Sequence, residues 1–184
     1  MPSNTTRRTS DGSAVEWQEA RQAWADAARP VLEGLASRYG AYVTYQELAQ
    51  AVQDATGITT GVPFRHWIGG VLSKVAEEQR RDEPILTALV VRADGSVGDG
   101  YAEPVHEREG TTPTDLDQHA AVERLRCYVH FGATIPADGG TPTLTKEVIA
   151  RRSRQRQPAA RRPVCPVHFL ELPTSGICPD CAED

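Results

Sequence analysis

The sequence predicts an α+β protein that is mainly helical and carries one small β-hairpin. Residues 42–101 read as a helix, a loop, a second helix and a strand that turns back on itself. That order is the plan of a winged helix-turn-helix, in which a two-stranded wing follows a pair of helices. Near the C-terminus, two closely spaced pairs of Cys and His residues are typical of a small zinc-ribbon-like knuckle.

The composition supports one modest core and no membrane segment. The chain has 184 residues, of which 39% are hydrophobic. No run of eighteen apolar residues occurs, and the N-terminus lacks the apolar stretch of a secretory signal. We therefore expect a cytoplasmic protein without a membrane partner.

Four segments are expected along the chain. Residues 1–12 are polar and predict a disordered tail, and residues 13–150 should form the helical domain. Residues 151–163 form an arginine-rich linker with six arginines and no acid, within a chain of net charge −5. Such a run attracts phosphate groups, but a solvated linker needs no partner, so both interpretations stay open. Residues 164–184 are the expected knuckle.

The first apolar pattern predicts two helices. From about Ser13, apolar side chains recur every three or four residues, the period of one helix face. Pro30 interrupts this pattern, because proline removes a backbone donor and clashes with the preceding turn. We expect helices over residues 13–28 and 30–39, with the tryptophans in the core rather than at a ligand.

A capping box marks the start of the next helix. Thr44 lies three residues before Glu47, so hydroxyl and carboxylate can each satisfy a backbone donor. The helix should cover residues 45–55 and end at Gly57, because glycine accepts a positive φ.

A second helix of this pair is expected from Pro63 to Arg80, with Lys74 on it. Proline is common at the first helical position. Gly69 and Gly70 lie mid-helix, where each costs up to about 1 kcal/mol relative to alanine. Such a cost predicts a close backbone approach by the preceding helix or by a ligand.

The segment after this helix predicts the wing. Residues 85–91, ILTALVV, are rich in β-formers, Asp94 and Gly95 make a hairpin turn, and residues 96–101 return.

Beyond the wing we expect a polar loop and two more helices. The loop covers residues 102–114, one helix starts at Asp115, and a short helix begins near Thr145. Cys127 lies on the first of these helices and should be an inert core residue.

Four short blocks occur in an order that resembles a known family. They are TYQELA at 44–49, the paired glycines followed by VL, PIL at 84–86 and DGSVGDGYAE at 94–103. Together they resemble the C-terminal winged domain of the alkylguanine-DNA alkyltransferases and the related alkyltransferase-like proteins. The resemblance covers residues 42–101 only.

The resemblance implies DNA contacts without catalysis. It implies that Tyr45 presses on a DNA phosphate and that an arginine fills the space left by a flipped nucleotide. The position of that arginine falls on His66, with Arg65 one residue earlier. The family's Pro-Cys-His-Arg motif is missing, because residues 87–90 are Thr, Ala, Leu and Val. The acceptor thiol is therefore absent, which excludes alkyl transfer and leaves a DNA-binding scaffold.

The C-terminal pairs predict a structural metal site. Cys165 and His168 have CxxH spacing, and Cys178 and Cys181 have CxxC spacing. Four nitrogen and sulfur ligands favour a closed tetrahedral zinc site, which leaves no open position for catalysis. A disulfide is the weaker alternative in a cytoplasmic chain.

The sequence therefore favours a non-catalytic DNA-binding protein, with double-stranded DNA as the preferred partner. The alternative is a protein-interaction adaptor that uses the winged domain and the knuckle as docking surfaces. An enzyme ranks third, since no nucleophile and base occur in a recognised arrangement. The residues expected to contact nucleic acid are Tyr45, Arg65, His66, Lys74, Arg151, Arg152, Arg154 and Arg156.

Overall fold

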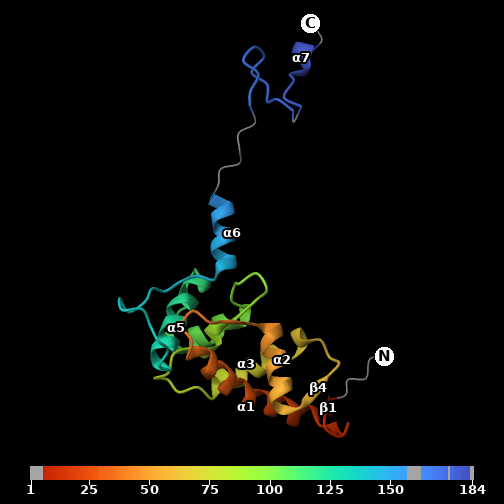
Figure 1. Cartoon of the computed structure of the whole chain (residues 1–184), viewed down its shortest axis with the longest axis vertical. Helices are drawn as coiled ribbons and strands as arrows, with labels where there is room; N and C mark the ends of the chain where they lie inside the picture. Colours follow the sequence, from red (N-terminus) through yellow and green to blue (C-terminus); the bar gives the residue numbers. More distant parts are fainter. Residues whose placement is uncertain (1–5, 157–162, 174, 183–184) are drawn as a thin grey trace. The chain divides into compact units, whose positions relative to one another are not determined.

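The structure is a computed structural model that describes residues 6–156, 163–173 and 175–182. It divides into two units, Met1–Ile149 and Ala150–Asp184. The described residues form a mixed structure of helices and small sheets (Figure 1), which agrees with the predicted α+β class. No helix among them is long and apolar enough to cross a membrane.

The elements follow one another in this order: β1 (Thr6–Arg8), β2 (Ala14–Val15), α1 (Trp17–Ala36), β3 (Val43–Thr44), α2 (Tyr45–Thr56), β4 (Ile58–Thr60), the 3-10 helix η1 (Phe64–His66), α3 (Ile68–Glu77), the 3-10 helix η2 (Leu86–Leu89), β5 (Val90–Val91), the 3-10 helix η3 (Asp99–Tyr101), α4 (Ala102–Glu109), α5 (Leu116–His130), α6 (Lys146–Arg156) and α7 (Pro179–Ala182).

The sequence predicts a disordered tail over residues 1–12. This prediction is wrong for residues 6–12, which the structure describes. Strand β1 lies between β2 and β4 in an antiparallel sheet, with Thr6 paired to Val15 and to Thr60. Thr6 is buried, and its hydroxyl donates to the carbonyl of Val15. A polar segment is ordered here because its backbone groups find partners far along the chain. Residues 1–5 lie outside the described residues.

Residues 17–36 form one helix, not the two that Pro30 predicted. Pro30 lies inside α1 on an exposed position. The carbonyl that loses its helical donor belongs to Asp26, which is also exposed, and access to water lowers the cost of the interruption. The opposite face of α1 packs against α2 and α3, as Figure 1 shows. Its buried residues are Ala20, Trp24, Ala25, Ala28, Leu32 and Ala36.

The capping box of α2 is confirmed. The backbone N–H of Glu47 donates to the Thr44 hydroxyl over 3.2 Å, and the backbone N–H of Thr44 donates to the Glu47 carboxylate over 2.8 Å. Gly57 ends the helix with φ 63°, as predicted. The hydrogen bonds from Thr44 hold the pKa of Glu47 below its ordinary value.

Replacing Thr44 with alanine should lower the free energy of unfolding by about 1 kcal/mol, the usual effect of losing a helix cap. Because the pKa of Glu47 is depressed in the folded state, its stabilisation is present above the unfolded pKa and is lost as the pH falls through the folded pKa. The difference in the free energy of unfolding between parent and variant, measured by urea unfolding, should therefore become smaller below about pH 4. Glu47→Gln is the matched control, because it keeps a capping side chain without the titration.

The expected helix over residues 63–80 appears as η1 followed by α3. At Gly70 the neighbour is a side chain of α1 and not the backbone of the preceding helix: a Cβ atom there would overlap with the Arg21 guanidinium. Gly69 has no such neighbour among the described residues.

The strand predicted over residues 85–91 is wrong for its first part, which forms the 3-10 helix η2. Only β5 is extended, and it pairs in parallel with β3. The turn at Asp94 and Gly95 forms, with Gly95 at φ 77°. Within the described residues, the two arms pair by a single bridge between Val91 and Val97, so the two-stranded wing is not formed as expected. Residues 85–91 are buried throughout, and an apolar run of this length fits a strand or a helix equally.

Three further predictions concern the remaining helices. Residues 102–109, expected in a loop, form α4. Helix α5 starts after Asp115, whose carboxylate accepts the Gln118 N–H over 3.0 Å, as predicted. The linker prediction for residues 151–163 is wrong for 151–156, which continue α6; residues 157–162 lie outside the described residues.

Candidate functional site

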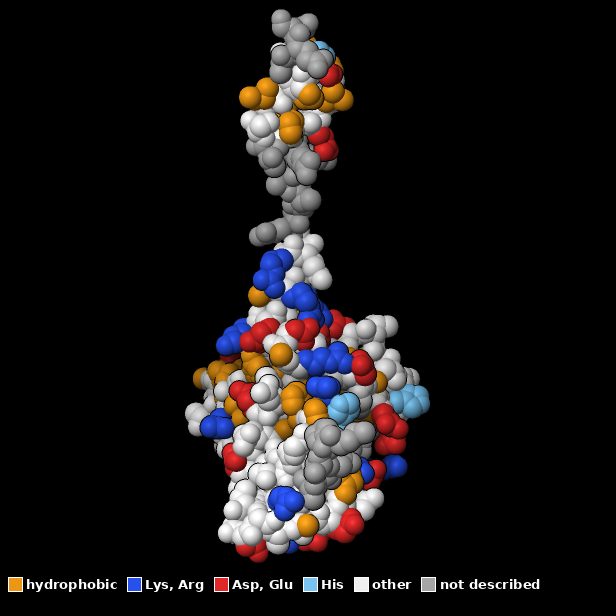
Figure 2. Space-filling view, turned by 90° about the vertical axis from the view of Figure 1, so that its right-hand side faces the viewer, with side chains coloured by type: hydrophobic (Ala, Val, Ile, Leu, Met, Phe, Trp, Pro, Cys, Tyr) orange, Lys and Arg blue, Asp and Glu red, His pale blue; other side chains and the backbone are white. Residues whose placement is uncertain are grey.

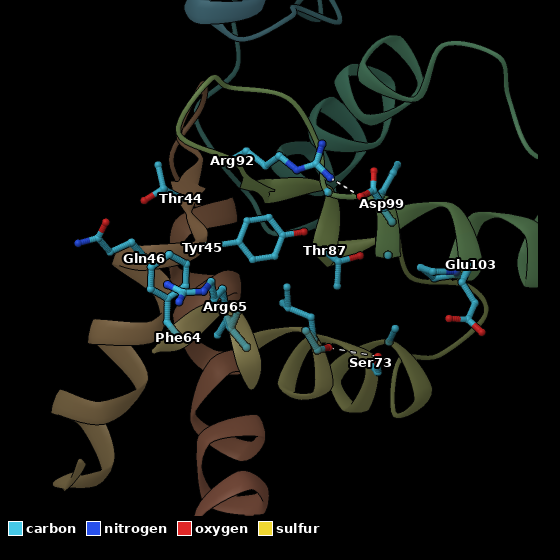
Figure 3. A pocket seen from close by; sticks show the side chains of 18 of the residues that line it. Thr44, Tyr45, Gln46, Phe64, Arg65, Ser73, Thr87, Arg92, Asp99 and Glu103 are labelled. Carbon is cyan, nitrogen blue, oxygen red and sulfur yellow. Dashed lines mark hydrogen bonds and ion pairs between the residues drawn. The ribbon is translucent and has the colours of Figure 1, made fainter. Parts of the chain in front are cut away.

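An open cavity of about 630 Å³ lies in the first unit, between the start of α2, the η1–α3 segment and the chain from Thr87 to Glu107. In Figure 3, Tyr45 and Arg65 come from one side, Glu103 from the other, and Thr87 lies between them. The cavity thus brings together residues that are distant in the sequence. Its volume falls within the range of about 300–1,000 Å³ that is usual for small-ligand sites.

Tyr45 lies on the cavity wall because it opens α2 directly after the capping residue. Its hydroxyl is close to Gly98, where a Cβ atom would overlap with it. Burial raises the pKa of Tyr45, so the phenol stays protonated near neutral pH and can donate a hydrogen bond.

An ion pair closes one side of the cavity. Arg92 donates to Asp99 with an Nη2 to Oδ2 distance of 2.7 Å, and this pairing raises the pKa of Arg92. The remaining charged side chains of the lining are Arg65, Glu77, Glu103 and Glu107. Carboxylates therefore outnumber guanidinium groups, and the interior suits a neutral or amino-bearing group better than a phosphate.

Of the predicted nucleic-acid contacts, Tyr45 and Arg65 line the cavity, and His66 and Lys74 are not among its lining residues. Arg65 and His66 are exposed on η1. Lys74 faces α1, where its ammonium group donates to the Gln22 side chain over 2.6 Å. The four predicted arginines of 151–156 lie on α6 in the second unit.

A hydrogen-bonded chain of side chains begins at Tyr101, which lines the cavity. The Tyr101 hydroxyl is 3.0 Å from His119 Nδ1, and His119 Nε2 is 3.0 Å from a Glu109 carboxylate oxygen. Burial raises the pKa of Tyr101, so this tyrosine is a poor nucleophile. These hydrogen bonds join η3, α4 and α5.

The second unit holds the predicted ligand cluster. The metal-binding atoms of Cys165, His168, Cys178 and Cys181 all lie within 4.8 Å of one another. His168 Nδ1 is 3.9, 3.6 and 3.3 Å from the sulfurs of Cys165, Cys178 and Cys181 respectively, and the sulfurs of Cys165 and Cys181 are 3.7 Å apart. This cluster can hold a metal ion.

These distances fit a tetrahedron. An ion about 2.3 Å from each sulfur and about 2.0 Å from nitrogen places sulfur atoms about 3.8 Å apart and sulfur and nitrogen about 3.5 Å apart. The cysteines are free, so the cluster is not a disulfide. Backbone N–H groups of His168 and Val167 point at the Cys165 sulfur and lower its pKa, which favours the thiolate that binds metal. Hydrogen bonding to Cys165 raises the pKa of Cys181 in turn.

The chain matches no family model, no curated protein and no solved structure. The features of the described residues that bear on its function are the cavity and the cysteine–histidine cluster.

Apart from Tyr45 and Arg65, the lining residues of the cavity were missed as site residues by sequence reasoning, among them Thr87, Arg92 and Asp99. Thr87 was placed in a strand, and the other two were placed in a hairpin. No local signal marks them, because their position depends on how η2 packs against α5 and α1.

Proposed function

We propose that this chain is a non-catalytic protein that binds double-stranded DNA with the face around the cavity. The observation that carries the proposal is that Tyr45 and Arg65, twenty positions apart in the sequence, line the same cavity. In the family that residues 42–101 resemble, the corresponding tyrosine presses on a phosphate and an arginine fills the space of a flipped nucleotide. We therefore assign these two roles to Tyr45 and Arg65.

The position of Arg65 favours it over His66 for the arginine role. Arg65 lines the cavity, whereas His66 is not among the lining residues. If Arg65 displaces a nucleotide from the duplex, that nucleotide would lie next to the cavity. In this proposal, α2 and the η1–α3 segment are the helix pair of a winged helix-turn-helix, and the turn at Asp94 and Gly95 is a reduced wing.

The placement of the thiols supports a role without alkyl transfer. Cys127 is fully buried on α5, burial raises its pKa, and it is not among the lining residues of the cavity. The other three cysteines belong to the metal cluster. A protonated, buried thiol does not act as a nucleophile.

The arginines of α6 would add attraction that does not depend on DNA sequence. Each phosphate neutralised releases counterions, so binding weakens as salt rises, with a slope near −0.9 per phosphate on a log-log plot. Helix α6 presents Arg151, Arg152, Arg154 and Arg156 on one short segment.

Fluorescence anisotropy with a duplex at several salt concentrations tests the proposal. Changing all four of these α6 arginines to glutamine should flatten the salt slope by several units, at roughly 0.9 per lost contact. Arg65→Ala should weaken binding about tenfold while changing the slope by at most about one unit. Arg81→Ala is the matched control, because Arg81 is exposed and is not among the lining residues.

If the parent fails to bind duplex DNA at low salt, or if all variants bind with the parent's affinity and slope, DNA is not the partner.

We also propose that the metal of the cysteine–histidine cluster is zinc and that its role is structural. Three thiolates and one imidazole in a tetrahedron are the ligands that zinc prefers. Four protein ligands leave no position for a reacting water.

A protein-interaction adaptor is the second candidate function, and one observation favours it. Figure 2 shows hydrophobic side chains gathered on the surface of the C-terminal unit. The exposed residues are Val164, Val167, Phe169, Leu170 and Ile177, with Phe169 at 80% exposure. Apolar groups exposed in this way often mark a protein-binding surface.

A further inference from the structure

The three sulfur ligands of the cysteine–histidine cluster differ in their exposure to solvent. Cys165 and Cys178 are 2% and 4% exposed, whereas Cys181 is an exposed residue. Cys181 lies on α7, which has only four residues. A dissolved oxidant reacts with a thiol that it can reach. Cys181 is therefore the first thiol of the cluster that such an oxidant meets.

A second thiol lies next to Cys181. The Cys165 Sγ atom is 3.7 Å from the Cys181 Sγ atom, and both cysteines are free. A disulfide bond is about 2.05 Å long, so the two sulfurs need to approach each other by less than about 2 Å. Cys165 is thus placed to react with an oxidised Cys181.

The backbone on the two sides of this sulfur pair is held differently. Cys165 belongs to a small hairpin, in which its N–H donates to the Leu170 carbonyl over 2.9 Å and its carbonyl accepts the Phe169 N–H over 2.9 Å. The bridge between Val164 and Glu171 continues the same pairing. Helix α7 is a single turn by comparison. A shift of this turn, and not of the hairpin, would bring the two sulfurs together.

We propose that Cys181 is an oxidation site for peroxides and that its oxidation ends in a disulfide with Cys165, which expels the metal ion. The loss of metal rests on the proposed zinc site, whereas formation of the disulfide does not. The disulfide would remove two of the four ligands and leave His168 and Cys178. Structural zinc sites almost always have four protein ligands, so two would not retain the ion.

The reaction has two balanced steps. The Cys181 thiolate attacks one oxygen of hydrogen peroxide, the O–O bond breaks, and a sulfenic acid and hydroxide form. The Cys165 thiolate then attacks the Cys181 sulfur, the S–S bond forms, and the S–O bond breaks with release of a second hydroxide. The two sulfurs together lose two electrons. The peroxide is reduced to two water molecules once both hydroxides take up protons.

Peroxide treatment of the zinc-loaded full chain tests this inference. Zinc is measured by elemental analysis before treatment and with a chromogenic chelator during it, and free thiols are counted after unfolding. The chain has four cysteines, so the thiol count should fall from four to two while about one zinc ion per chain is released. Cys127 is the internal control, because it is fully buried on α5 and should stay reduced.

Protease sites in the chain allow the disulfide to be identified. Glu171 lies between Cys165 and Cys178, and Asp180 lies between Cys178 and Cys181. Once the free thiols are alkylated, cleavage after acidic residues places these three cysteines on three separate peptides. Mass spectrometry should find the Cys165 and Cys181 peptides joined and Cys178 alkylated.

Two histidine variants form a matched pair. Structural zinc sites use two cysteines and two histidines as well as three cysteines and one histidine, so Cys181→His and Cys178→His should both bind zinc. Cys181→His lacks the exposed thiol and should keep its zinc at the peroxide dose that empties the parent. Cys178→His keeps Cys165 and Cys181 and should release zinc as the parent does.

The outcomes separate this inference from the proposed zinc site. Any other disulfide pairing in the parent, no loss of thiols, or equal zinc release from Cys181→His and the parent would overturn the inference and leave the zinc site standing. If neither histidine variant binds zinc, the pairing found in the parent decides. A parent without zinc that still forms the disulfide between Cys165 and Cys181 would refute the zinc site and support the oxidation site.

Discussion

Replacing Cys178 with serine is expected to reduce bound zinc from about one equivalent per chain to near zero. The Cys178 sulfur is buried, lies 3.6 Å from His168 Nδ1 and belongs to the four-ligand cluster. Structural zinc sites contribute roughly 10–16 kcal/mol of apparent binding free energy, most of which is lost without a full ligand set. The neighbouring apolar side chains are exposed rather than packed, so this segment has little core to hold it without metal. Residues 164–182 should therefore become sensitive to protease.

Elemental analysis after gel filtration measures the zinc, and limited proteolysis measures the order of the segment. Cys127→Ala is the matched control: it also removes a buried cysteine, but one outside the cluster, and it should keep its zinc. A fully loaded Cys178→Ser variant would show that the cluster is not the zinc site. A parent purified without chelator that contains no zinc would show the same.

Replacing Trp24 with alanine is expected to lower the free energy of unfolding by about 3–5 kcal/mol, the usual range for deleting a large core side chain. Trp24 is completely buried on α1. Its indole stacks on Trp67, with ring centroids 4.3 Å apart, and its Nε1–H donates to the Ile58 carbonyl over 3.0 Å. One side chain thus joins α1 to the start of α3 and to β4, so its loss should weaken all three attachments.

Urea unfolding followed by circular dichroism measures this effect. Trp24→Phe is the comparison, because it keeps an aromatic ring in the core and loses the hydrogen bond to Ile58; it should cost about 1–3 kcal/mol. An alanine variant that unfolds at the parent's urea concentration would place Trp24 outside the core.

The sequence predicted well those features that depend on residues close together along the chain. The box of Thr44 and Glu47 satisfies donors within one helical turn, and Asp115 caps α5 in the same way. The ligand spacing of the C-terminal cluster is also local, because a CxxC or CxxH turn directs two side chains to one point.

Tyr45 and Arg65 were found as site residues through the resemblance, whereas Thr87 was not. Thr87 lies in a segment whose residues are all buried. The segment therefore lacks the alternation of apolar and polar residues that would distinguish a strand from a 3-10 helix. Its place on the cavity wall depends on Glu123 and Arg124, more than thirty residues away in the sequence.

The caps, the main helical faces and the cysteine–histidine cluster could therefore be predicted from the sequence, since they follow from interactions within a few residues. Long-range packing instead places β1 in a sheet, keeps Pro30 inside one helix and folds residues 86–89 into a 3-10 helix. In each of these cases the backbone adopts the conformation whose polar groups are satisfied by distant partners or by water. Local propensity amounts to less than about 1 kcal/mol per residue, apart from proline at about 3 kcal/mol, and burial against α1 and α5 outweighs it.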